Sequence, residues 1–304
     1  MTLDIVGQGR KGMSGKVAGQ AAMTSGTDRG MPLAMRHRDR LTELLSAVDS
    51  PLSEYGFANL YLFRDTHDYR FVDCAIPHLR GTAYDGQRHI MPLGPIDEHM
   101  IALLDEAECL YPIGAEGPAI AERLDLSCTW NDADSDYVYD AARLALLDGA
   151  KTKRAQAREF ERAQSPVARW FAKNDESEAR AVLAGWLADV GRSAATTDVA
   201  ACIEALSLRE ALGLEGMLVV RGGGEPVAFL LASVRTDGSR VVHFAKGRRA
   251  YAGAYPWMFA RYAATCGAVW LNFEQDLGKP AFAQAKRALA PSGQLRKYRL
   301  KRRD

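Results

Sequence analysis

Three short apolar runs joined by tight turns, in the last third of the chain, restrict the fold more than any other feature. The runs cover residues 216–221, 226–235 and 240–246, separated by three glycines at 222–224 and by Asp237-Gly238. Glycine adopts the positive φ angles of tight turns without steric cost, and such turns between apolar runs are typical of β-hairpins. The pattern predicts three consecutive antiparallel strands.

Helical and strand patterns surround these three strands in a defined order. Apolar residues at helical spacing precede them at 179–190 and 197–212, and a helix at 255–266, a strand at 268–272 and a helix at 280–288 follow. Three antiparallel strands followed by a helical crossover to one more strand resemble the GCN5-related N-acetyltransferase (GNAT) fold. The last third therefore resembles the second half of a double acyltransferase-type α/β protein.

The first half carries a weaker pattern of the same kind, which predicts a first α/β domain. Its expected helices are 39–48, 53–64, 96–109 and 119–124, and its expected strands are 68–76, 89–93 and 136–139. The start of the chain is rich in Gly, Ser, Thr and Lys without aliphatic periodicity, which favours disorder. We expect an α/β (α+β) protein with two tandem GNAT-like domains, each a mixed, mainly antiparallel sheet flanked by helices. The expected divisions are a disordered leader at 1–32, an N-terminal domain at 33–150, a helical connector at 151–175 and a C-terminal domain at 176–304.

Composition indicates a globular protein outside the membrane. Of the 304 residues, 47% are hydrophobic and 25% charged, and no run approaches the roughly 18 apolar residues of a membrane span. We therefore expect a cytoplasmic protein without integral membrane association. The five cysteines and six histidines show no metal-site spacing, so reduced thiols and no metal centre are expected.

Positive charge gathers in two runs although the net charge is only +1. Six cations lie within 296–303, and a second run begins at 151. Each run suits either a solvated face or a phosphate-contacting surface. On the second interpretation, the residues that contact a nucleic acid are Lys151, Lys153, Arg154, Lys297, Arg299, Lys301 and Arg302.

An ordered set of segments over roughly residues 40 to 300 resembles the phosphatidylglycerol lysyltransferase C-terminal domain family. The segments are 53–64, 136–139, 151–154, His243-Phe-Ala-Lys246, Tyr251 with Gly253 and Tyr255, Asn272-Phe-Glu-Gln-Asp-Leu-Gly278, Ala285-Lys286 and Lys297-Tyr298. The chain departs from the family at Phe273, where Arg is usual, and at 288–291. The resemblance implies tandem GNAT-like domains and aminoacyl-tRNA as the donor, with no other cofactor. A small amine or hydroxyl acceptor, for example in specialised metabolism, is expected.

Aminoacyl transfer requires groups that hold the ester, deprotonate the nucleophile and stabilise the oxyanion. Glu274 and Asp276 follow a predicted strand, where either is a candidate base or a ligand of the amino group; capping of the next helix is the alternative for Asp276. His243 is a third catalytic candidate. The resemblance and the chemistry also imply a set of substrate-binding residues, for most of which packing is the alternative: Asn59, Arg64, Lys246, Tyr251, Tyr255 and Asn272.

Two other functions remain open at this point. An acetyl-CoA-dependent N-acetyltransferase binds pyrophosphate at a helix N-terminus, but the basic stretch 247–254 does not have the usual loop spacing. A non-catalytic tRNA- or protein-binding module is the third reading.

Overall fold

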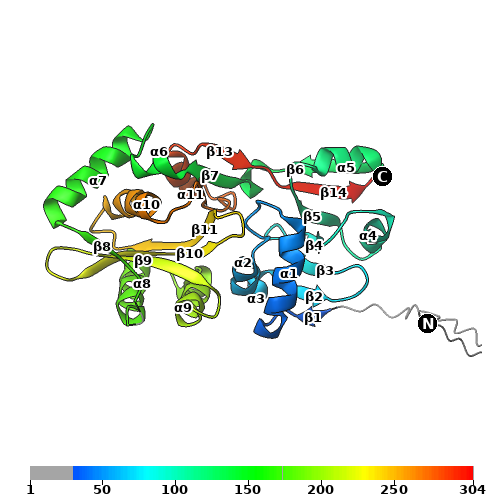
Figure 1. Ribbon diagram of the computed structural model, residues 1–304, viewed down its shortest axis with the longest axis horizontal. Coiled ribbons are helices and arrows are strands. Elements are labelled where there is room, and N and C mark those ends of the chain that lie inside the picture. The colour runs from blue at the N-terminus through cyan, green and yellow to red at the C-terminus, as the bar shows by residue number, and fades with distance from the viewer. Residues whose placement is uncertain (1–29, 173, 304) are drawn as a thin grey trace, which may run out of the picture.

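The computed structural model describes residues 30–172 and 174–303 as two seven-stranded sheets lying side by side (Figure 1). From edge to edge the first sheet contains β1 (Met31–Pro32), β2 (Arg70–Val72), β3 (His78–Thr82), β4 (Arg88–Pro92), β5 (Cys109–Ile113), β14 (Tyr298–Arg302) and β6 (Leu126–Trp130). The second contains β13 (Gly293–Leu295), β7 (Asp136–Asp140), β12 (Trp270–Asn272), β11 (Arg240–Gly247), β10 (Pro226–Val234), β9 (Leu214–Val220) and β8 (Val167–Trp170).

Helices cover both sheets, so the expected fold class of two tandem, mixed GNAT-like domains is confirmed. In the second half, α8 (Glu176–Val190) and α9 (Val199–Ser207) cover one face of the sheet, whereas α7 (Lys151–Gln164) and α10 (Ala254–Thr265) lie on the other (Figure 1). The remaining helices are η1 (Met35–His37), α1 (Arg38–Val48), α2 (Phe57–Leu62), α3 (Arg64–His67), α4 (Glu98–Ala102), η2 (Leu103–Asp105), α5 (Gly117–Arg123), η3 (Asp132–Asp134), α6 (Ala141–Ala145), η4 (Ala194–Thr196) and α11 (Pro280–Arg287).

One hydrophobic core joins the two halves. It combines Leu41 and Leu60 of the first half with Leu183, Cys202 and Phe244 of the second. These side chains have at most 2% of their surface exposed, and burial of each large apolar side chain contributes roughly 1.5–3 kcal/mol. The halves are therefore packed as one body rather than joined only by a linker.

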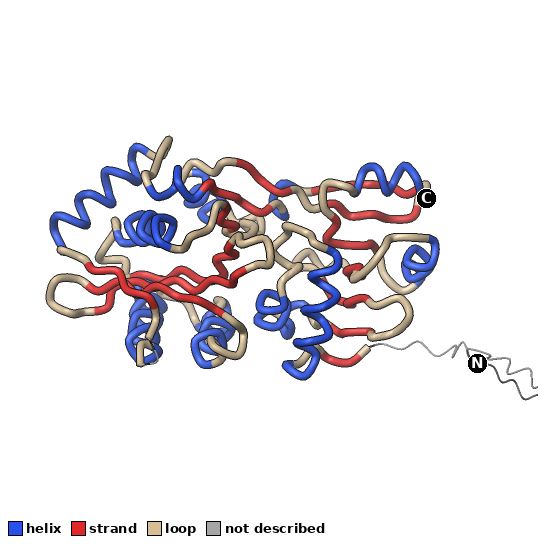
Figure 2. Tube along the Cα trace, in the orientation of Figure 1, coloured by secondary structure: helices blue, strands red, loops and turns tan. Residues whose placement is uncertain are grey.

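The two sheets exchange a strand. β7, which follows β6 directly along the chain, pairs with β12 and β13 of the second sheet. β14, which follows β13, pairs with β5 and β6 of the first sheet. The tube in Figure 2 shows both connecting segments passing between the sheets along the upper side of the view. Strand pairing therefore crosses the divisions expected at 150 and 176.

Most second-half elements lie where the sequence predicts them, whereas the first half differs. The expected strand at 68–76 is only β2, and the expected helix at 96–109 ends before β5 begins. The helical pattern after 141 is interrupted by β8. Strands β3, β5, β6, β13 and β14 are not predicted, because strands of three to five residues give little periodicity.

The start of the described chain also differs from expectation. Residues 1–29 of the expected leader lie outside the described residues. Met31 and Pro32 form β1, which pairs with Phe71 and Arg70, so the prediction of disorder is wrong for these two residues. Within the described chain, no helix combines the length and the apolar character needed to cross a bilayer.

Each sheet contains one short parallel pair. β4 pairs with β5 only at His89↔Cys109 and Ile90↔Leu110. β11 pairs with β12 only at Arg240↔Leu271 and Val241↔Asn272. Because β11 continues to Gly247 while β12 ends at Asn272, the second half of β11 is unpaired on that side. His243 lies on this unpaired part of β11, and Glu274, just beyond the end of β12, contacts it there.

Candidate functional site

Glu274 lies two residues beyond the end of β12, in a left-handed backbone conformation with φ +58°. Its backbone N–H donates to Oδ1 of Asn272 at 2.7 Å, which fixes the turn locally. Its Oε1 accepts a hydrogen bond from Nδ2 of Asn59 at 2.8 Å and lies 2.8 Å from Nδ1 of His243. No described residue forms a hydrogen bond with Oε2, and the side chain is 16% exposed. One carboxylate oxygen is thus held in place while the other is free.

His243 lies on β11 and contacts this carboxylate through Nδ1. Its Nε2 lies 2.9 Å from Oγ of Ser233 on β10, and only 1% of its side chain is exposed. In the neutral form, Nδ1–H donates to Glu274 and Nε2 accepts from the Ser233 hydroxyl. The lone strand histidine therefore fixes the orientation of the glutamate. We call Asn59, Ser233, His243 and Glu274 the Glu274 cluster.

The Glu274 cluster is built by both halves, because Asn59 belongs to α2. This asparagine is buried, and its amide donates across the interface between the two halves. Sequence reasoning singled out Asn59, His243 and Glu274 separately, and the structure brings the three together. Ser233 was missed, since a serine within an apolar strand carries no motif.

A second polar group lies buried between the two connecting segments. Nζ of Lys297 lies 2.7 Å from Oε1 of Glu54, 2.6 Å from Oδ1 of Asp136 and 2.6 Å from Oε1 of Gln275. Burial favours the neutral amine, but the carboxylates of Asp136 and Glu54 outweigh it and raise the pKa of Lys297. Burial likewise raises the pKa of Glu54 to about 6, against the attraction of Lys297. We call Glu54, Asp136, Gln275 and Lys297 the junction network.

Two of the cations predicted to contact a nucleic acid, Lys297 and Arg299, are buried, so the prediction is wrong for them. Lys297 is fully buried, and Arg299 is 6% exposed and pairs with Asp134 at 2.9 Å and with Asp85. Both residues belong to the segment that enters the middle of the first sheet, so neither is available to a phosphate. Lys301 is partly exposed, and the exposed Arg302 pairs with Asp105 at 2.8 Å.

The remaining members of the Asn272–Gly278 motif support the turn. Asn272 is buried and donates from Nδ2 to Asp136 at 2.9 Å. Asp276, which is 4% exposed, accepts from the Tyr137 hydroxyl at 2.8 Å and from the Gly278 N–H at 2.9 Å. These contacts favour the turn role of Asp276 over the catalytic one, because its carboxylate is already occupied.

Four other predicted substrate-binding residues lie outside the Glu274 cluster. Arg64 forms two 2.9 Å bonds with Glu204 of α9, which links the two halves. Lys246 pairs with Asp198 at 2.7 Å and lies 4.0 Å from the ring centre of Trp186. The Tyr251 ring packs on Phe160, and the Tyr255 hydroxyl donates to the Gly247 carbonyl at 3.4 Å. All four are occupied by protein contacts.

Helix α7 carries the basic run that remains at the surface. Lys151 is exposed and Lys153 and Arg154 are half-exposed. None of the three pairs with an acidic side chain in the part of the chain that the structure describes. Lys151, Arg154 and Arg158 lie within about 60° of one another around the helix and form the cationic face of α7, whereas Lys153 lies toward the side of the buried Phe160.

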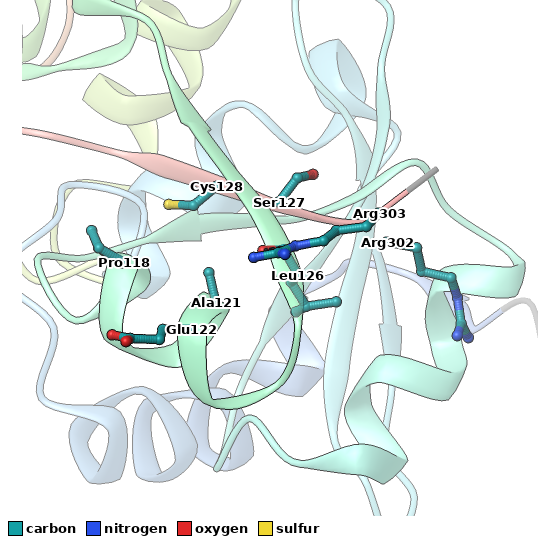
Figure 3. A pocket seen from close by; sticks show the side chains of 8 residues that line it. All are labelled: Pro118, Ala121, Glu122, Leu126, Ser127, Cys128, Arg302 and Arg303. Carbon is teal, nitrogen blue, oxygen red and sulfur yellow. Dashed lines mark hydrogen bonds between the residues drawn. The ribbon is translucent and has the colours of Figure 1, made fainter.

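Other surface features do not coincide with the Glu274 cluster. A hollow of about 540 Å³ lies between α5 and the ends of β6 and β14 (Figure 3). Its lining consists of Pro118, Ala121, Glu122, Leu126, Ser127, Cys128, Arg302 and Arg303. No three or more His, Cys, Asp or Glu side chains in the described ranges are arranged to hold a metal ion.

Comparison with known proteins places these features in a family. The family described as "Phosphatidylglycerol lysyltransferase, C-terminal" matches residues 46–301. No curated protein matches the chain. A conserved protein of unknown function from Bacteroides thetaiotaomicron is 24% identical, with a TM-score of 0.78 over 90% of this chain and 98% of that one.

Two structures of named family members share the fold at lower identity. L-PGS from Bacillus licheniformis is 15% identical, with a TM-score of 0.58 over 90% of this chain and 93% of that one. The C-terminal domain of a putative lysylphosphatidylglycerol synthetase from Agrobacterium fabrum is 14% identical, with a TM-score of 0.58 over 88% and 93%. These likenesses establish the fold, and the match over residues 46–301 establishes the family. This chain belongs to the phosphatidylglycerol lysyltransferase C-terminal family.

Proposed function

We propose that this protein transfers an amino acid from aminoacyl-tRNA to an amine or hydroxyl of a small acceptor. The observation that carries the proposal is the Glu274 carboxylate, with Oε1 fixed by Asn59 and His243 and Oε2 free at a partly exposed position. Family membership supports the donor class. A carboxylate oxygen can take the proton of either an amine or a hydroxyl acceptor.

Glu274 suits the role of general base. An aminoacyl ester is already activated, so attack requires a positioned nucleophile that loses its proton as the new bond to the carbonyl carbon forms. The free Oε2 accepts that proton, and the tRNA ribose oxygen leaves with the electrons of the ester bond. His243 and Asn59 keep the carboxylate in place through Oε1. If Glu274 instead binds the donor's α-ammonium group, its loss raises KM for the donor rather than lowering kcat.

The cationic face of α7 supports a nucleic-acid donor. Lys151 and Arg154 lie on this face without acidic partners among the described residues. Recognition of an RNA stem depends largely on phosphates and shape, for which such a face is suited. Lys301 is a further candidate contact at the other end of the molecule.

The packing of α10 argues against acetyl-CoA as the donor. A CoA-dependent enzyme binds pyrophosphate on the free N–H groups of a helix N-terminus. Here the N-cap of α10 is Gly253, and α7 packs so closely on it that a Cβ would lie 2.2 Å from the Gln156 carbonyl oxygen. This end of the helix is covered by protein.

The test of the chemistry combines charged tRNA with candidate amines and alcohols and detects aminoacylated products by mass spectrometry. We expect Glu274→Gln to lower kcat about 100-fold or more with KM for the donor unchanged. Glu178→Gln, which alters a half-exposed ion pair with Arg169, is the control and should keep full activity. Tight binding of acetyl-CoA without affinity for charged tRNA would overturn the proposal. Binding of charged tRNA without turnover would indicate a binding module.

The test of the donor surface is a triple charge reversal on α7. Lys151→Glu, Arg154→Glu and Arg158→Glu together should weaken tRNA binding about tenfold or more at low salt and flatten its salt dependence. The control reverses three exposed arginines of the first half, namely Arg36→Glu, Arg38→Glu and Arg40→Glu, with the same change in net charge. Equal loss in both variants would show that net charge alone, and not the α7 face, attracts the tRNA.

A further inference from the structure

Lys286, at the end of α11, contacts the main chain of the Glu274 turn. Its Nζ donates to the carbonyl oxygen of Glu274 at 3.0 Å and to that of Gln275 at 2.5 Å. Its own carbonyl accepts from the Tyr139 hydroxyl at 2.8 Å, which fixes the end of the helix to β7. The ammonium group therefore holds two successive carbonyls of the turn from a fixed position.

The turn requires such support because its backbone is strained. Both Glu274 and Leu277 have φ +58°, a left-handed conformation that costs a residue with a side chain about 1–2 kcal/mol. Two consecutive carbonyls that point to one side are electrostatically unfavourable unless a cation or donor meets them. Lys286 supplies that cation, and the Tyr137 N–H adds a 3.1 Å hydrogen bond to the Glu274 carbonyl.

We propose that Lys286 is a positioning residue that holds the Glu274 turn, and thereby aims the free carboxylate oxygen of Glu274 at the substrate. The inference rests on the proposed function for its catalytic consequence and on the geometry alone for its effect on the turn. Lys286 contacts no atom of the Glu274 carboxylate in the described structure, so it acts through the backbone. Loss of its charge leaves the Gln275 carbonyl without this donor and the Glu274 carbonyl with the Tyr137 N–H alone, and so lets the left-handed turn relax.

The charges around Lys286 make this support sensitive to pH. Burial lowers the pKa of Lys286 to about 8, against the attraction of the carboxylates of Glu274, Asp136 and Asp276 and together with the repulsion of Lys297. The Tyr137 ring lies 5.6 Å from Nζ on the remaining side. Above about pH 8 the amine becomes neutral, and its attraction to the two carbonyls weakens. Transfer activity should therefore decline on the alkaline side.

The experiment compares Lys286→Met, Lys286→Arg and the control Lys279→Met, an exposed lysine at the start of the same helix. Lys286→Met should lower kcat about 10- to 100-fold with KM for charged tRNA within twofold, and should lack the alkaline decline. Lys286→Arg, which stays charged far above pH 8, should recover part of the activity and keep it at pH 9. Lys279→Met should resemble the unaltered protein.

Hydrogen exchange of two amides at the turn tests the inference without catalysis, namely the Glu274 N–H, which donates to Asn272, and the Tyr137 N–H, which donates to the Glu274 carbonyl. The protection factors should fall about tenfold or more in Lys286→Met, and in the unaltered protein between pH 7 and 9, but not in Lys279→Met. Unchanged protection, or an alkaline decline in activity that persists in Lys286→Met, would overturn the inference. If the unaltered protein transfers no amino acid, the proposed function fails and the exchange result still decides the role of Lys286.

Discussion

Each half of the molecule has a buried histidine on the first strand of its short parallel pair. The two histidines differ in their hydrogen bonds. His243 on β11 has a partner on each ring nitrogen. His89 on β4 has none among the described residues and packs between the rings of Tyr69 and Tyr111, at 6.1 and 5.4 Å between centroids. Burial, followed by repulsion from His67, lowers the pKa of His89 to about 3.

The two halves use the same architecture for different purposes. In the second half the opening beside β11 holds a carboxylate with a free oxygen. In the first half the corresponding region is filled by aromatic rings, and this half contributes to the site the side chain of Asn59 from α2. The chemistry is therefore expected in one half and structural support in the other, although the two halves share a fold.

The largest loss of stability is expected at the junction network, to which the residues of both halves contribute. Lys297→Met leaves Glu54 and Asp136 buried without their cation, which should lower the free energy of unfolding by about 3–5 kcal/mol. Arg302→Met, at the far end of β14, which Lys297 directly precedes, breaks an exposed ion pair and should cost less than about 1 kcal/mol. Urea denaturation measures both. Similar losses in the two variants would mean that the junction network contributes little.

The same substitution at the two buried histidines should have different effects on catalysis. His243→Phe removes the fixed partner of Glu274 and should lower kcat about 10- to 100-fold. His89→Phe exchanges one buried ring for another and should leave kcat within about twofold. Steady-state transfer rates decide the matter. Comparable losses of kcat would place chemistry in both halves.

Acid should act on the first half through His89. The unfolded chain binds a proton at His89 near pH 6.5, whereas the folded protein does so only near pH 3, so this group lowers stability as pH falls from about 6.5 to about 3. Unfolding free energies measured at pH 7 and pH 4.5 should differ by about 1–3 kcal/mol less in His89→Phe than in the unaltered protein. An unchanged difference would show that His89 is protonated in the folded state.

The smallest loss of stability is expected at the ion pair between Arg64 of α3 and Glu204 of α9. Arg64→Met removes two hydrogen bonds to Glu204 at a partly exposed position and should cost about 1 kcal/mol of unfolding free energy. Arg143→Met, which breaks an exposed pair within the α6 region, is the control and should cost less. If Arg64→Met lowered kcat/KM strongly while the free energy of unfolding changed by only about 1 kcal/mol, Arg64 would lie near the substrate instead.

The local sequence pattern predicts the main strands of the second half. It does not predict which strands of the two halves pair with each other. Strands β9, β10 and β11 have seven to nine residues with glycine turns, so periodicity predicts them within two residues. The exchange of β7 and β14 was not predictable, because it depends on contacts between residues far apart in sequence.

The candidate site also depends on contacts between residues far apart in sequence, which local pattern does not predict. The Asn272–Gly278 motif points to Glu274, whereas the C-terminal cations wrongly predict a phosphate-contacting surface at Lys297 and Arg299. A run of six cations within eight residues has the same sequence whether its side chains are solvated or buried. Only the acids at 54, 85, 134 and 136, which approach from the first 140 residues, decide the question.

The exchange of strands also sets an order of events during synthesis. Strand β14 lies between β5 and β6, both of which leave the ribosome long before it does. Until β14 arrives, the first sheet has an open place in its middle, with the unpaired backbone groups of β5 and β6 facing each other. We therefore expect the nascent first half to need protection, and a chain interrupted before residue 298 to recover its fold when the missing strand is supplied as a separate peptide.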